Sequence, residues 1–187
     1  DGNLTQDGRW QYTWNGENRL IKAIELIAPT NRQPYEVNYA YDHRGRMVWK
    51  SVAPTTSPPL KTIQYLWDDY NIIAEVECRE SGVTTTYNTW GLDLSGTHQG
   101  AGGVGGLLAV YSPLPLGEGQ GEGEGGTALP CYDANGNITE YLSTNGTITA
   151  HYEYSPFGEI VIQSGPLAYS FTHRFSTKPW CAVTGLS

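Results

Sequence analysis

The sequence holds 187 residues with a formal charge of −8 and a pI near 4.9. Nucleic-acid-binding proteins normally present a basic face to phosphates, and transmembrane helices need a long apolar run. The sequence shows neither feature, so we expect neither nucleic-acid binding nor a membrane span. Thirteen Tyr and six Trp against three Phe suit half-buried strands, while 23 Gly and 11 Pro argue against long helices. Composition therefore favours an all-β chain.

Alternation of apolar and polar residues with a period of two predicts strands along most of the chain. At the start, Trp10, Tyr12 and Trp14 would share one face of a strand. Residues 19–26 have some helical propensity, but the turn residues beside them favour a strand. The expected strands are residues 9–14, 19–26, 36–41, 46–52, 61–67, 71–78, 83–90, 107–111, 128–132, 137–142, 147–154 and 159–163.

The clearest turn lies within residues 132–141. Tyr132 closes one strand, and Asp133 is expected to accept backbone N–H groups through its side chain. Asn135 and Gly136 tolerate a positive φ, which Gly136 is predicted to adopt. This pattern predicts a tight hairpin turn with a structural role.

The same pattern recurs earlier in the chain, where an aromatic residue and Asp are again followed by Gly four places after the aromatic. Recurrence at intervals of about 22 to 27 residues indicates consecutive antiparallel hairpins that pack side by side. The residues assigned this turn role are Tyr41, Asp42, Gly45, Tyr132, Asp133, Asn135 and Gly136.

Composition divides the chain into four parts. Residues 1–111 carry hairpin repeats with a Gly-rich bend at 91–106, and residues 112–127 form a low-complexity Gly/Glu/Pro segment expected to be a mobile insertion loop. Hairpin repeats resume at 128–163, and 164–187 is an irregular, truncated tail. The expected anchors of this tail are Phe171, Phe175 and Trp180.

Each group of residues that could bind a cofactor or a metal, or react, also has a structural interpretation, which the sequence favours. Gly100, Gly102 and Gly105 satisfy GxGxxG, but no βαβ unit is predicted around them, so a glycine-lined bend is favoured. The four His show no ligand spacing, and the three widely spaced Cys are expected to be buried free thiols. We therefore expect no catalytic residue, no metal, no cofactor and no enzymatic activity.

Several segments together resemble the tyrosine-aspartate (YD) repeats of RHS proteins. Besides the turns, they are WGLDLSG at residues 90–96, the Gly-rich run at 100–108, YEYSPFG at 152–158, FSTK at 175–178 and TGL at 184–186. Their order most resembles the region leading into the RHS repeat-associated core. The segment beginning at residue 112 departs from the family because it is longer than the usual connector.

The resemblance implies a section of a spiralling β-sheet shell, which encloses or presents a C-terminal toxin or effector domain in a bacterial polymorphic toxin. The implied partner is the remainder of the same chain, and the implied location is secreted or on the cell surface, although this fragment carries no signal peptide. The family's autoproteolytic aspartate site would follow residue 186, so no catalytic residue is carried over. The alternative is an adhesion module that binds cell-surface carbohydrate or protein.

Overall fold

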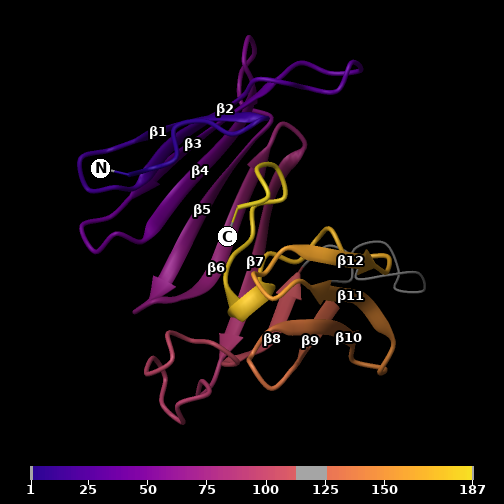
Figure 1. Ribbon diagram of the computed structural model, residues 1–187. Coiled ribbons are helices and arrows are strands. Elements are labelled where there is room, and N and C mark those ends of the chain that lie inside the picture. The colour runs from indigo at the N-terminus through magenta and orange to yellow at the C-terminus, as the bar shows by residue number, and fades with distance from the viewer. Residues whose placement is uncertain (1, 113–125, 187) are drawn as a thin grey trace. The chain divides into compact units, whose positions relative to one another are not determined.

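The computed structural model describes residues 2–112 and 126–186. Within these residues, twelve strands follow one another as antiparallel hairpins, and their order in the sheet is their order in the sequence (Figure 1). The only helix in the described parts is the short 3-10 turn η1 (Phe175–Thr177), so the all-β prediction is confirmed. The strands are β1 (Trp10–Trp14), β2 (Leu20–Glu25), β3 (Tyr35–Tyr41), β4 (Met47–Pro54), β5 (Lys61–Asp68), β6 (Asn71–Arg79), β7 (Gly82–Trp90), β8 (Leu107–Ser112), β9 (Gly126–Tyr132), β10 (Ile138–Ser143), β11 (Ile148–Tyr154) and β12 (Ile160–Ser164).

The chain forms two compact units. The first comprises Asp1–Leu66 and Glu75–Val83, and the second comprises Trp67–Ala74 and Thr84–Ser187. The four-part division by composition follows different boundaries and stays a prediction. Most of its expected insertion loop, residues 113–125, lies outside the described residues.

The first unit buries one face of its strands, as the period-two pattern requires. Trp10 and Tyr12 are buried and Trp14 is half-buried, so the predicted face of β1 is the inward one. Ala23 of β2 lies opposite Val37 of β3 in the antiparallel register, and both are fully buried. Small and β-branched residues thus pack directly across this strand pair.

The second unit has an aromatic core. Tyr141 stacks on Phe171 with ring centroids 3.8 Å apart, and Tyr152 meets Tyr141 edge-on at 6.5 Å. Their hydroxyls donate to tail carbonyls, Tyr141 to His173 O at 2.9 Å and Tyr152 to Ala168 O at 2.7 Å. Buried phenols need such partners, so the irregular tail completes the core of β10 and β11.

The expected tail anchors and the three cysteines differ in how deeply they are buried. Phe171 is buried, whereas Phe175 and Trp180 are half-buried. Cys78, Cys131 and Cys181 are not joined in disulfides, but only Cys181 is buried and the other two are half-buried. The expectation of buried thiols is therefore wrong for Cys78 and Cys131.

Candidate functional site

The turn after β9 is held by the Asp133 carboxylate. One oxygen accepts the N–H groups of Asn135 at 2.8 Å and Asn137 at 3.0 Å, and the other accepts the Asn137 amide at 2.7 Å. Burial alone would raise the pKa of Asp133, but these hydrogen bonds lower it below its ordinary 3.8. Gly136 has φ +75°, the conformation expected from the sequence. Tyr132, at the end of β9, donates its hydroxyl to Leu107 O.

The turn after β3 repeats this chemistry in the first unit. Asp42 accepts the N–H groups of Arg44 at 2.9 Å and Arg46 at 3.0 Å, and Gly45 has φ +78°. The second Asp42 oxygen pairs with the Arg46 guanidinium at 2.7 Å. Tyr41 donates its hydroxyl to Leu20 O at 2.8 Å. The predicted turn residues therefore form two turns, one within each unit.

The Asp133 turn is fastened to the tail and to the Gly-rich bend within the second unit. Thr177 Oγ1 donates to Gly136 O at 2.8 Å and accepts the Gly105 N–H at 2.8 Å. The Ser176 N–H donates to Asn137 Oδ1 at 2.8 Å. Ser176 and Thr177 both have positive φ, which is unusual for residues with a Cβ, so these bonds hold a strained segment in place.

The Gly-rich bend is organised by a carboxylate rather than by a nucleotide phosphate. Asp93 Oδ2 accepts the N–H groups of Ala101 at 2.7 Å and Gly103 at 3.1 Å. A Cβ on Gly103 would lie 2.5 Å from Asn71 Oδ1. Close approach of backbone to side chain therefore accounts for Gly103.

A pocket of about 680 Å³ lies beside the Asp133 turn. Its walls come from the turn, from strands β10 and β11, from the turn after β11 and from the tail segment at η1. The titratable residues that line it are Asp133, Glu140, His151, Tyr152, Glu153 and Tyr154. The pocket thus collects carboxylates around one imidazole, an arrangement that the turn pattern did not predict.

His151 lies between two of these carboxylates. Its Nδ1 is 2.9 Å from Glu140 Oε1 and its Nε2 is 3.3 Å from Glu153 Oε1, and the pKa of His151 is raised chiefly by the bond to Glu140. The two nitrogens lie on different edges of the ring, so one metal ion cannot meet both contacts. In the described parts of the chain, no cluster of His, Cys, Asp and Glu is suited to a metal ion.

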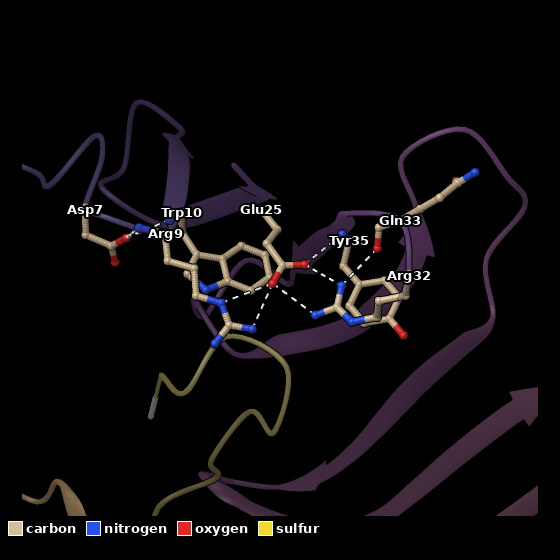
Figure 2. A network of polar contacts seen from close by, with 7 residues as sticks. All are labelled: Asp7, Arg9, Trp10, Glu25, Arg32, Gln33 and Tyr35. Carbon is tan, nitrogen blue, oxygen red and sulfur yellow. Dashed lines mark hydrogen bonds and ion pairs between the residues drawn. The ribbon is translucent and has the colours of Figure 1, made fainter. Parts of the chain in front are cut away.

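Sequence reasoning missed a polar cluster in the first unit. Figure 2 shows Arg9 and Arg32 reaching the Glu25 carboxylate from opposite sides, at 2.8 Å and 2.6 Å. Tyr35 N–H adds a third donor at 3.1 Å. Burial would raise the pKa of Glu25, but the hydrogen bonds from Arg32 and then Arg9 lower it to about 2. The sequence held one sign of this cluster: Glu25 lies two residues after Ala23, so the acid falls on the same inward face of β2.

Sequence reasoning also missed Arg174, which is buried with 1% of its surface exposed. Its guanidinium lies 3.7 Å from the Trp180 ring centroid and 4.7 Å from that of Tyr152. It donates to Ala168 O at 2.9 Å. Carbonyls and ring faces thus surround this cation, and nothing in an irregular tail marks one Arg for burial.

The chain is similar to segments of several solved structures. The TcdB2-TccC3 structure matches with a TM-score of 0.66 and 14% identity over 94% of this chain. A Photorhabdus luminescens Tc holotoxin pore with a TccC3 mutation matches with a TM-score of 0.67 and 15% identity over 96%. TcdB2-TccC3 without its hypervariable C-terminal region matches with a TM-score of 0.65 and 14% identity over 95%. No family model and no curated protein sequence matches the chain.

These likenesses show a shared fold. The chain spans only 8% of the length of each of these three chains. Among the described residues, none of the helices has the length and apolarity needed to cross a membrane.

Proposed function

We propose that this chain is a structural section of an RHS-type β-sheet shell, which encloses or presents a C-terminal toxin or effector domain of the same protein. The observation that supports the proposal is the likeness of nearly the whole chain to a small part of the TcdB2-TccC3 chain. The likeness persists in the structure that lacks the hypervariable C-terminal region, so the matched part lies outside that region. This chain would accordingly belong to the scaffold rather than to the cargo.

The proposal assigns the chain a partner and a location. Consecutive hairpins bury their faces by packing on neighbouring hairpins, so further strands of the same protein are the natural partner. A protein that delivers a toxin acts outside the producing cell, which implies secretion or display on a bacterial cell surface. Both assignments depend on the proposed shell.

We propose further that the chain has no catalytic activity of its own. Asp42 and Asp133 are occupied by the hydrogen bonds of their turns. The pKa of the Cys131 thiol is raised by burial and by Glu140, so this thiol stays protonated and is a poor nucleophile. Both nitrogens of His151 face carboxylates rather than a nucleophile.

Limited proteolysis of the intact protein tests the shell. The downstream domain should resist protease in the intact protein and become cleavable when the sheet is destabilised, for example by Gly136→Val. The isolated downstream domain, produced alone, is the control for intrinsic resistance. Equal cleavage of this domain alone and within the intact protein would contradict enclosure.

A binding role is the second candidate, and one exposed pair favours it. Tyr87 of β7 and Tyr111 of β8 are cross-strand partners, 53% and 43% exposed, with ring centroids 6.4 Å apart. Exposed aromatic faces can stack on sugar rings. Binding on a glycan array that disappears in Tyr111→Ser, while thermal stability is kept, would support adhesion over a purely structural role.

A further inference from the structure

The imidazole of His151 has an acceptor at each of its nitrogens. A neutral imidazole has one N–H, so it can donate to only one carboxylate while its bare nitrogen faces a second acceptor. Imidazolium has two N–H groups and can donate to Glu140 and Glu153 at once. The arrangement of these three side chains is therefore that of a positively charged His151.

We propose that His151 is a protonation-dependent clasp, which joins Glu140 of β10 to Glu153 of β11 while charged and releases Glu153 when it loses its proton. The asymmetry of the two contacts decides which carboxylate leaves. Glu140 is closer, at 2.9 Å against 3.3 Å, and its side chain is 27% exposed against 55% for Glu153. A single remaining N–H stays on the nearer, less solvated carboxylate.

The described lining of the pocket supplies no cation that competes with His151 for the two carboxylates. Among the described residues that line the pocket, none is Lys or Arg. On β9, Cys131 lies opposite Glu140, and on β12, Ser164 lies opposite His151 and Ile162 opposite Glu153. The other titratable groups in the wall are Asp133, whose oxygens are held by the turn, and the phenols of Tyr152 and Tyr154. Loss of the His151 proton therefore makes the pocket more negative by one charge.

The sign of the effect on stability follows from the raised pKa. A histidine whose pKa is higher in the folded protein stabilises it fully below the unfolded value, near 6.5, and this stabilisation is lost as the pH rises through the folded value. The clasp is thus closed in mildly acidic solution and opens on the alkaline side.

Histidine-selective ¹³C NMR on the intact protein tests the clasp directly, with the His151 signal assigned through His151→Gln. The titration midpoint of His151 should lie above 6.5, and Glu153→Gln should lower it. Glu159→Gln is the matched control, because Glu159 is an exposed acid in the next turn and lies outside the pocket lining. A His151 midpoint at or below 6.5, or an unchanged midpoint in Glu153→Gln, would overturn the proposal.

Thermal unfolding separates the clasp from a purely packing role of the imidazole ring. His151→Gln should lower Tm relative to the natural chain in mildly acidic solution, and the difference should shrink at alkaline pH. A packing role would give the same difference in Tm at both pH values, and that result would reject the clasp. The test is independent of the proposed shell, since it measures only protonation and stability.

Discussion

The Asp42 and Asp133 turns share their side-chain chemistry but differ in the surroundings of their glycine. Both glycines have nearly the same positive φ, +78° at Gly45 and +75° at Gly136. A Cβ on Gly45 would meet nothing within 4 Å, whereas one on Gly136 would lie 2.5 Å from Val104 Cγ1 and 3.1 Å from Gly105 N. The aromatic-Asp-x-x-Gly pattern therefore specifies the turn. Segments far away in the sequence decide whether other parts of the chain also pack against the glycine of that turn.

The second oxygen of each aspartate shows the same contrast. The second oxygen of Asp42 forms a local and partly exposed ion pair with the Arg46 guanidinium. The second oxygen of Asp133 accepts a hydrogen bond from the Asn137 amide, and Asn137 in turn accepts the Ser176 N–H from the tail. The Asp42 carboxylate thus bonds to residues of its own turn, and Arg19 also donates to Asp42 O at 3.2 Å. The Asp133 turn is bonded through Asn137 to Ser176, which lies 39 positions away.

The largest difference is expected between Gly136→Val and Gly45→Val. Each substitution forces a Cβ into the left-handed region, which costs about 1–2 kcal/mol. Gly136→Val also crowds Val104 and the Gly105 backbone, and overpacking of this kind adds roughly 1–3 kcal/mol. Denaturant unfolding of both variants measures the difference.

Equal losses in these two variants would show that the docked turn can move away from the bend at no cost. Gly136→Ala is a useful intermediate, because it adds the Cβ without the branched methyl groups. It should fall between the natural chain and Gly136→Val in its free energy of unfolding.

The same contrast explains how far the sequence could predict this structure. Period-two alternation and turn residues predicted each strand and the φ of Gly136, because both depend on neighbours along the chain. The burial of Arg174 and the role of Thr177 depend on the folded tail, and no local pattern marks them. The Glu140–His151–Glu153 cluster needs strand register, which a pattern of single strands does not give.

The next largest effect is expected from Thr177→Val, which keeps the shape of the side chain but removes its hydroxyl. Gly136 O and Gly105 N–H would both lose the partner that joins them. A buried polar group left without a partner costs about 1–3 kcal/mol. Thr147→Val is the control, because Thr147 is an exposed Thr in another turn of the same unit.

Thermal unfolding of the two Thr variants checks this expectation. Thr177→Val should lower Tm clearly, and Thr147→Val should leave it nearly unchanged. If Thr177→Val is as stable as the natural chain, the Asp133 turn is not held by the tail, and its contrast with the Asp42 turn disappears.

The smallest effect separates the two aspartates by their response to salt and acid. Asp133→Ala should cost about 1 kcal/mol as its turn hydrogen bonds are lost, with little dependence on salt because its partners are neutral amides. Asp42→Ala also removes the ion pair to Arg46, so its loss in Tm should be larger at low salt than at high salt.

The pKa of each aspartate is lowered by its hydrogen bonds against the opposing effect of burial, so their stabilisation is present above 3.8 and is lost as the pH falls through the folded value. Both variants should therefore approach the natural chain in Tm as the solution becomes acidic. Tm measured over salt and pH for the two variants and the natural chain tests this, and a salt-dependent loss in Asp133→Ala would mean that its turn depends on a charge that the structure does not pair with it.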